Sequence, residues 1–127
     1  MLTGKLGELA AFKYFTGTLG KIVKWVNKYN ETGLPYDLVV EEEGGHIGYI
    51  ERKATKSARK DWFNISTREW QFAAEKGESF SISHVLLLSD KEVKITVYTN
   101  PIKLCQHDKL QLVVLMPMQW KDFAIVS

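Results

Sequence analysis

The feature that most constrains this fold is a pair of adjacent apolar segments separated by two glycines. The segments YDLVVEEE and HIGYIERK carry β-branched and aromatic residues, and Gly44-Gly45 stands between them. A Gly-Gly pair between two such runs is a strong β-hairpin signal, because both central positions of the favoured turn need a positive φ. The segment therefore predicts two antiparallel strands, with the glutamates Glu41–Glu43 in a solvated turn.

Helix and strand signals on both sides extend the hairpin into an α/β domain. Thr3–Phe15 predicts a helix capped by Thr3. Thr67–Lys76 predicts a second helix, because Ser66 and Glu69 have the spacing of a capping box, and we assign both residues to that cap rather than to chemistry. The other predicted strands are KIVKWVN, SFSISHVLLLS and EVKITVYTN, and the C-terminal run LQLVVLMPM is a further strand-like segment.

The order of these elements, α-β-β-β-α-β-β, predicts one mixed β-sheet flanked by helices. A chain of 127 residues suits a single domain, residues 1–127, and the helical pattern at its very start suggests a piece of a longer protein. One cysteine, Cys105, permits no internal disulfide and favours an intracellular setting. No apolar run approaches the ~20 residues that cross a bilayer, so no membrane partner is expected.

Three charged side chains are expected to meet at one corner of the hairpin. Side chains alternate along a strand, so Glu51 and Lys53 share one face. Asp37 opens the preceding strand, and in an antiparallel hairpin the start of one strand lies beside the end of the next. Two carboxylates and one ammonium group therefore converge, either as an ordinary surface ion pair or as a reactive site.

Such a corner suits a hard divalent cation, Mg²⁺ or Mn²⁺, because Mg²⁺ takes one or two carboxylates together with water and phosphate oxygens. A bound metal polarises a phosphodiester and activates water, and a lysine beside it can orient that water or offset developing charge. Glu8 is a further candidate, since on a helical wheel it lies with Ala11, Phe12 and Phe15. It could ligate a second metal or hydrogen-bond the lysine, or simply occupy a helix N-terminus, where acids are favoured.

Four ordered blocks add a family resemblance to this pattern. GKLGE, VKWVN…NETGLPYDLVV, YIERKAT and ISTREWQFA together resemble the C-terminal domain of plant NO VEIN proteins, roughly from Gly4 to Pro101. Glu8, Asp37 and Glu51-x-Lys53 also resemble the PD-(D/E)xK nuclease superfamily, with its restriction-endonuclease-like core. The plant resemblance implies a nuclear location.

The nuclease resemblance implies a Mg²⁺-dependent endonuclease. Asp37, Glu51 and the backbone carbonyl of Arg52 would hold the metal, and Lys53 would serve the water. Two features depart from the superfamily pattern. Asp37 is one residue displaced from the usual Pro-Asp, and Arg52 replaces a residue that is usually apolar. The superfamily also includes members that do not cleave.

A basic run from Arg52 to Lys60 follows the proposed site and holds five Lys or Arg residues. It is either a phosphate-binding surface or a solvated loop, and the net charge of +2 does not by itself decide. Candidate contacts are Lys56, Ser57 and Arg59, with Arg68 at the start of the second predicted helix. The expected partner is nucleic acid, DNA rather than RNA, and cutting both strands would favour a homodimer. A non-cleaving nucleic-acid-binding module and a protein-interaction module are the alternatives.

Overall fold

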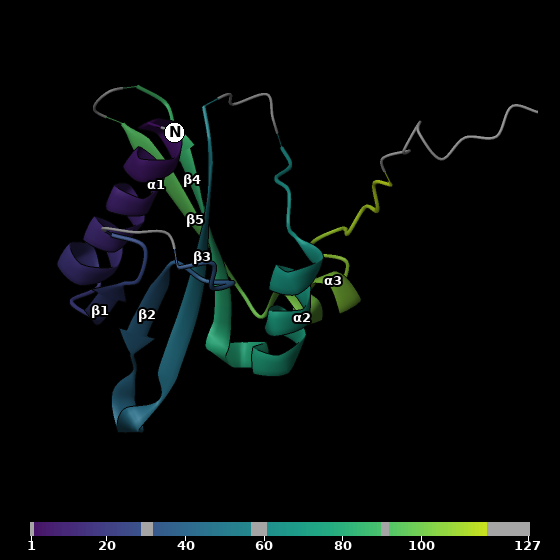
Figure 1. Ribbon diagram of the computed structural model, residues 1–127, viewed down its shortest axis with the longest axis horizontal. Coiled ribbons are helices and arrows are strands. Elements are labelled where there is room, and N and C mark those ends of the chain that lie inside the picture. Colours follow the sequence, from purple (N-terminus) through teal and green to yellow (C-terminus); the bar gives the residue numbers. More distant parts are fainter. Residues whose placement is uncertain (1, 29–31, 57–60, 90–91, 117–127) are drawn as a thin grey trace, which may run out of the picture.

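A computed structural model describes residues 2–28, 32–56, 61–89 and 92–116, and these form an α/β domain with a mixed sheet (Figure 1). This confirms the predicted α/β class and mixed sheet. The elements are α1 (Leu2–Lys13), the π-helical turn η1 (Tyr14–Thr18), β1 (Ile22–Trp25), β2 (Leu38–Glu41), the 3₁₀ turn η2 (Glu43–Gly45), β3 (Ile47–Thr55), α2 (Thr67–Lys76), the 3₁₀ turn η3 (Gly77–Ser79), β4 (Phe80–Leu87), β5 (Val93–Thr99) and α3 (Pro101–Gln106).

Within the described residues the sheet has five strands in the order β1-β2-β3-β4-β5. Every neighbouring pair is antiparallel except β3 and β4, which are parallel. A parallel pair needs a crossover connection, and α2 lies in that connection. The predicted hairpin is β2–β3, and its turn contains Gly44 and Gly45, both with positive φ.

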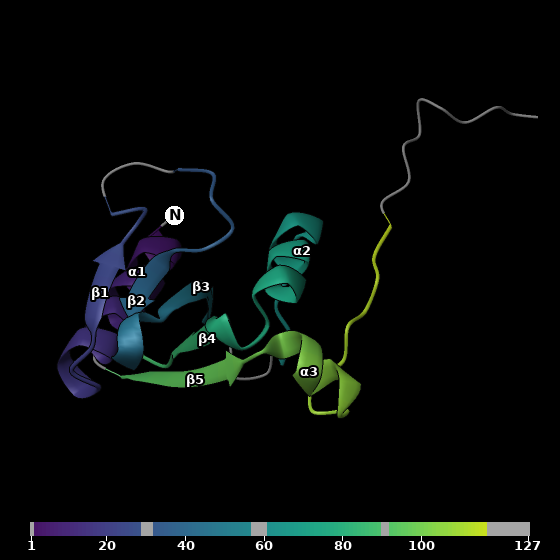
Figure 2. The same ribbon diagram turned by 90° about the horizontal axis from the view of Figure 1, so that it is seen from below.

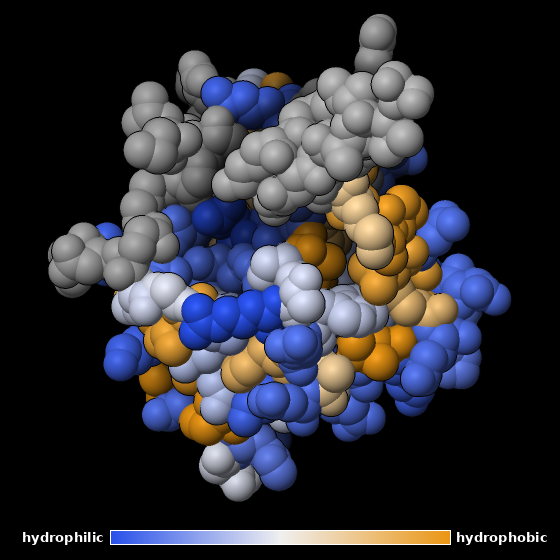
Figure 3. Space-filling view, turned by 45° about the vertical axis from the view of Figure 1, so that its right-hand side comes forward, coloured by the Kyte–Doolittle hydropathy of each residue, from blue (hydrophilic) through white to orange (hydrophobic). Residues whose placement is uncertain are grey.

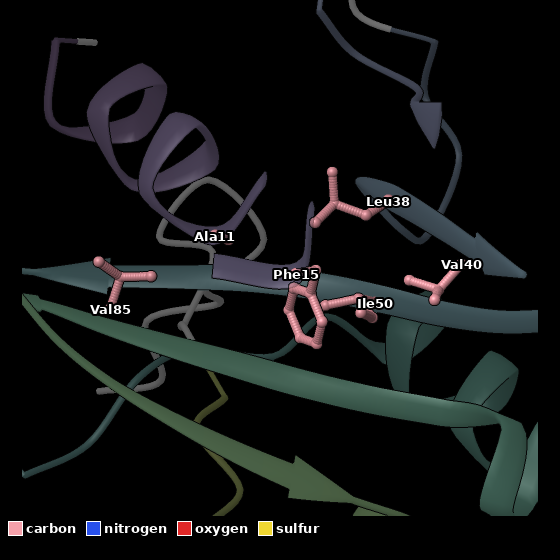
Figure 4. Packing of buried hydrophobic residues seen from close by; sticks show 6 residues of the cluster. All are labelled: Ala11, Phe15, Leu38, Val40, Ile50 and Val85. Atoms are coloured by element: carbon pink, nitrogen blue, oxygen red, sulfur yellow. The ribbon is translucent and has the colours of Figure 1, made fainter. Parts of the chain in front are cut away.

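Two apolar clusters fix the helices to opposite sides of the sheet, with α1 on one side and α2 and α3 on the other (Figure 1). The residues of one strand divide between them, because Ile50 belongs to the α1 cluster and Tyr49 to the α2 cluster. Figure 4 shows the buried members of the α1 cluster, which are Ala11, Phe15, Leu38, Val40, Ile50 and Val85. The α2 cluster is built on Ala73, Phe80 and Ile82, with Phe72 of α2 and Ile102 of α3 packed against it.

The second predicted helix is confirmed at both ends. The Ser66 hydroxyl accepts a hydrogen bond from the Glu69 backbone N–H (3.0 Å), and the Ser66 N–H donates to the Glu69 carboxylate (2.9 Å). At the other end Gly77 takes a positive φ of 53° as the C-cap. The first helix begins at Leu2, so Thr3 lies inside it and is not the cap that the sequence predicted.

The C-terminal segment differs from the prediction. Of the predicted strand LQLVVLMPM, residues 111–116 form no strand, and Pro117 and Met118 lie outside the described residues. A β-strand needs a neighbour for its backbone groups, and this segment leaves α3 in a direction away from the sheet (Figures 1 and 2). The preceding helix α3 was not predicted, although Asn100 caps it and Pro101 occupies its first turn.

Gly7→Ala should destabilise the protein, because the added Cβ would lie 2.7 Å from Ala54 Cβ and 2.9 Å from Arg52 Cδ. The Arg52 side chain can move, but Ala54 Cβ is fixed to the backbone of β3. Overpacking of this kind costs about 1–3 kcal/mol, which outweighs the gain of about 1 kcal/mol from alanine's higher helix propensity. We expect a net loss of about 1 kcal/mol in the free energy of unfolding, measured by urea denaturation.

Gly17→Ala is the matched control, because nothing lies within 4 Å of a Cβ added in η1. It should leave stability unchanged or slightly higher. A Gly7→Ala protein as stable as the Gly17→Ala protein would show that α1 does not depend on this close approach to β3.

Candidate functional site

Asp37 lies between the end of β1 and the start of β2, beside the middle of β3, and four hydrogen bonds hold it. Its backbone N–H donates to the Ile50 carbonyl and its carbonyl accepts from the Val26 N–H, both at 2.8 Å. Its side chain is only 6% exposed. One carboxylate oxygen, Oδ2, accepts from the Arg52 backbone N–H and the other, Oδ1, from Asn27 Nδ2, each at 2.8 Å. The carboxylate is therefore fixed in orientation against the start of β2.

Asn27 was not identified from the sequence, yet it completes this arrangement. Its buried side-chain oxygen accepts from both the backbone N–H (3.0 Å) and the hydroxyl (2.7 Å) of Thr32. These two bonds orient the amide so that its NH₂ group faces Asp37. In the sequence, Asn27 is only the polar last residue of a predicted strand.

Glu51, Lys53 and Glu69 form the charged part of the site on the α2 face of β3. The Lys53 ammonium lies 3.3 Å from Glu51 Oε2 and 2.8 Å from Glu69 Oε1. Glu51 is 8% exposed, and its carboxyl group is hydrogen-bonded to that of Glu69. Asp37 is close enough to act on Glu51 electrostatically. The structure thus brings Asp37, Glu51 and Lys53 together and adds a third carboxylate.

The two glutamates share one proton. Burial raises the pKa of Glu51 from 4.5 to about 10, helped by the hydrogen bond to Glu69 and by the charges of Asp37 and Glu69, while Lys53 opposes the rise. Burial would also raise the pKa of Glu69. Hydrogen bonds from Glu51, Lys53 and the Ser66 backbone N–H outweigh this effect of burial and lower the pKa of Glu69 to about 2. These opposite shifts favour a protonated Glu51 beside an ionised Glu69, with one proton between the two coupled carboxyl groups.

Glu69 thus has two roles, of which the sequence indicated only one. The same oxygen, Oε1, accepts from the Ser66 backbone N–H in the capping box and from the Lys53 ammonium. A local capping signal cannot show the second contact, which depends on how α2 packs across the sheet. The N-terminus of α2 is consequently tied to the middle of β3 by a partly buried ion pair.

Glu8 and Arg52 lie on the opposite face of the sheet, beneath α1. Glu8 is 3% exposed and accepts a hydrogen bond from Trp25 Nε1 (3.2 Å), while its other oxygen lies 3.5 Å from Arg52 Nη2. Arg52 alternates with Glu51 and Lys53 and so takes this face. Glu8, the predicted ligand of a second metal, thus contacts Arg52. It lies across the sheet from Lys53, the lysine that it was expected to hydrogen-bond.

His84 lies next to Lys53 in the register of β3 and β4. Its Nε2 is 3.0 Å from the Thr55 hydroxyl and its ring stacks on Phe63 at 5.6 Å. Burial lowers the pKa of His84. This hydrogen-bonded histidine forms part of the wall beside Lys53.

The predicted nucleic-acid contacts are not gathered on one face. Lys56 is exposed and lines a groove beside α1, on the side of the sheet away from Lys53. Arg68 is exposed in the first turn of α2, next to Glu69. Ser57 and Arg59 lie outside the described residues. Seen with α2 and α3 turned forward, the surface has a hydrophilic hollow with apolar side chains gathered beside it (Figure 3).

Within residues 2–28, 32–56, 61–89 and 92–116, no three His, Cys, Asp or Glu side chains are arranged to hold a metal ion by themselves. Asp37 and Glu51 offer two carboxylates, the number that a hydrated Mg²⁺ commonly takes from a protein. None of the helices in the same ranges combines the length and the hydropathy that a membrane crossing requires.

Comparison with known proteins matches residues 7–98 to the family model described as "Protein NO VEIN, C-terminal". The chain belongs to the NO VEIN C-terminal family. Among curated relatives from Arabidopsis thaliana, Protein NO VEIN is 55% identical and Protein NO VEIN-LIKE 51% identical, each over 119 residues. Both matches cover 92% of this chain but only 4% and 18% of the relatives, so the chain spans a small part of their length. No solved structure matches.

The family assignment confirms the resemblance to NO VEIN C-terminal domains and encloses the whole site. The matched region includes all of β3 and α2 and part of α1, with Glu8, Asn27, Asp37, Glu51, Lys53 and Glu69. Membership in the PD-(D/E)xK superfamily stays a prediction.

Glu51→Gln should stabilise the NO VEIN C-terminal domain at high pH in the absence of metal. Because the Glu51 pKa rises from 4.5 to about 10 on folding, the folded state keeps a proton that the unfolded state releases between these values. Stability therefore falls as pH rises through this range. Glutamine keeps the hydrogen bond without ionising, so we expect a gain of about 1 kcal/mol or more at pH 8 and a smaller gain at pH 5, by urea denaturation in EDTA.

The exposed Glu75→Gln on α2 serves as the control and should change stability little at either pH. A Glu51→Gln protein that loses as much stability at pH 8 as at pH 5 would contradict the assignment of the proton to Glu51.

Proposed function

We propose that this domain is a metal-dependent nuclease-fold domain that binds DNA and hydrolyses its phosphodiester bonds. The observation that carries the proposal is the convergence of Asp37, Glu51 and Lys53 at one buried corner. The order α1-β1-β2-β3-α2-β4 around a mixed sheet is consistent with a restriction-endonuclease-like core, which we propose as the finer fold assignment.

The donor set at the corner fits a divalent cation. The carboxylates of Glu51 and Glu69 contact the Lys53 ammonium, and Asp37 lies close enough to act on Glu51 electrostatically; burial, with these neighbouring charges, raises the pKa of Glu51. Such a site has an excess of oxygen donors and of negative charge, which Mg²⁺ or Mn²⁺ would balance. Asp37 and Glu51 would hold the cation, with the backbone carbonyl of Arg52 as a third donor. When bound, the cation would polarise the phosphodiester and lower the pKa of a water.

The chain's own residues would position the reacting groups. The two donors to Asp37 fix the direction of its carboxylate before any ligand arrives. Glu69 holds the Lys53 ammonium from the α2 side, beside Glu51. From this position Lys53 would orient a water or offset negative charge developing on phosphate oxygens.

DNA contacts would come from the α2 side of the molecule. Arg68 is exposed next to the capped N-terminus of α2 and is the described candidate nearest to Glu69 in sequence. Ser57 and Arg59 keep their proposed roles on sequence grounds alone. The placement of Lys56 beside α1 makes it a weaker candidate, since a phosphate there would lie across the sheet from Lys53. A nuclear location and action as a homodimer on both strands belong to the same proposal.

Cleavage of plasmid and linear DNA in Mg²⁺ or Mn²⁺ tests the proposal. The wild-type protein should nick or linearise plasmid, and EDTA should abolish this. Lys53→Met and Asp37→Asn should each lower the rate by about 100-fold or more, the size of loss seen when one stabilising donor is removed. Circular dichroism and thermal unfolding should show that both variants fold.

Lys24→Met, at an exposed lysine of β1, and Glu43→Gln, in the exposed hairpin turn, are matched controls and should cleave at the wild-type rate. Equal activity in wild-type, Lys53→Met and Asp37→Asn proteins would show the site assignment to be wrong. Salt-sensitive DNA binding without cleavage would overturn hydrolysis in favour of a binding module. Neither binding nor cleavage of DNA or RNA would favour a protein-interaction module.

A further inference from the structure

The C-terminal segment exposes five consecutive apolar residues, Leu112–Met116. Their exposed fractions are 45, 75, 72, 84 and 82%. Single exposed apolar residues are ordinary, but a contiguous run marks an interaction surface. The segment is uncharged and rich in leucine and valine, a composition that favours a strand once a partner backbone is available.

The end of α3 sets the direction in which this segment leaves. The Lys109 N–H bonds back to the Leu104 carbonyl at 2.8 Å, and Asp108 takes a positive φ of 57°. These features close the helix, and the segment then runs away from the sheet in both views (Figures 1 and 2). Its apolar side chains therefore stand clear of the β5 edge of their own chain.

The outer edge of β5 offers unpaired backbone groups. Within the described residues β5 is the last strand of the sheet. Leu88 N–H bonds to the Glu92 carbonyl (3.0 Å) at one end, and Asn100 N–H to the Phe80 carbonyl (2.9 Å) at the other. Because antiparallel pairs alternate, the even-numbered residues of β5 bond to β4 and the odd-numbered ones face outward. The outward set is Val93, Ile95, Val97 and Thr99.

A groove lined by both apolar and polar side chains accompanies this edge on the α1 face. It has a volume of about 1020 Å³ and lies between α1 and the β4–β5 end of the sheet. Leu9 and Ala10 line one side, and Leu87, Val93 and Ile95 line the other. Val93 remains 46% exposed. A strand added to the edge of β5 would place alternate side chains into this groove.

We propose that Leu112–Met116 of one copy pairs with the outer edge of β5 in a second copy, so that two chains exchange these segments and dimerise. Donor and acceptor occur in the same chain, which lets the exchange close symmetrically. Five extended residues span about 17 Å, within the length of the seven-residue β5. Each match to an Arabidopsis relative covers 92% of this chain. The segment Leu112–Met116 therefore lies inside the matched part, whichever residue of this chain the match begins at.

The expected dimer is of modest affinity. If each segment buries about 300 Å² of its own surface and a similar area of the acceptor, two exchanges bury roughly 1,200 Å², the lower end of the range for specific interfaces. Micromolar dissociation constants are ordinary for such an area. None of the residues in this exchange belongs to the Asp37–Glu51–Lys53 corner, so its failure would remove the proposed homodimer but would leave metal binding and cleavage at that corner to be tested separately.

Sedimentation velocity on the full chain, over protein concentrations from about 1 to 200 μM, tests the exchange across the affinity range expected for this area. Wild-type protein should shift from the mass of one copy to that of two. Val114→Asp, at a position 72% exposed in the single copy, should weaken dimerisation at least tenfold without affecting the fold. Val93→Pro should weaken it similarly, because it removes an outward N–H at the first residue of β5, where proline is tolerated.

Ile22→Asp is the matched control, being 69% exposed on β1 at the opposite edge of the sheet, and should dimerise like wild type. A wild-type protein that stays monomeric at every concentration overturns the proposal. This includes a monomer in which the C-terminal segment pairs with its own chain. The proposal is also overturned by a dimer that survives Val114→Asp, or by one that responds to Val114→Asp but not to Val93→Pro, since the tail would then pair elsewhere.

Discussion

Asp37 joins the end of β1 and the start of β2 to the middle of β3, and the arrangement of the site follows from that junction. Asp37 bonds through its backbone to Val26 and Ile50 and through its side chain to Asn27 and Arg52. A buried carboxylate must find such donors, because leaving it unpaired costs several kcal/mol. Here the donors include the backbone of β3 itself, so satisfying the acid also sets where β3 lies against β2. The side chains that follow along β3 then have fixed positions.

Strand β3 carries buried charge on both faces, and each covering helix supplies a carboxylate to meet it. Lys53 faces α2 and is paired with Glu69, while Arg52 faces α1 and is paired with Glu8. Gly7 lets α1 approach closely enough for its partner residue to be buried. Half-buried ion pairs of this kind contribute less to the stability of the fold than to its specificity. A misplaced helix would leave a charge unpaired. The charges on β3 thus help to determine which face each helix covers.

Local signals in the sequence were sufficient for the hairpin, for both ends of α2 and for the shared face of Glu51 and Lys53. The Gly44-Gly45 pair and the Ser66–Glu69 capping box act within a few residues, so no knowledge of packing was needed. The contact from Glu69 to Lys53 joins residues 16 apart and depends on how α2 crosses the sheet. Composition alone also cannot tell whether an apolar run has a neighbour, which is why the segment after α3 was wrongly predicted as a strand.

If the corner binds metal as proposed, a count of formal charges would favour a divalent cation over a second ammonium group. The three carboxylates of Asp37, Glu51 and Glu69 and the ammonium group of Lys53 carry formal charges that sum to −2, and a proton on Glu51 reduces this to −1. A divalent cation that displaced the proton would bring the sum to zero, whereas a monovalent one would change nothing. Lys53 lowers the pKa of Glu51 by less than burial and the neighbouring carboxylates raise it. In the proposed function, a bound cation would therefore take the place and the charge of the proton on Glu51.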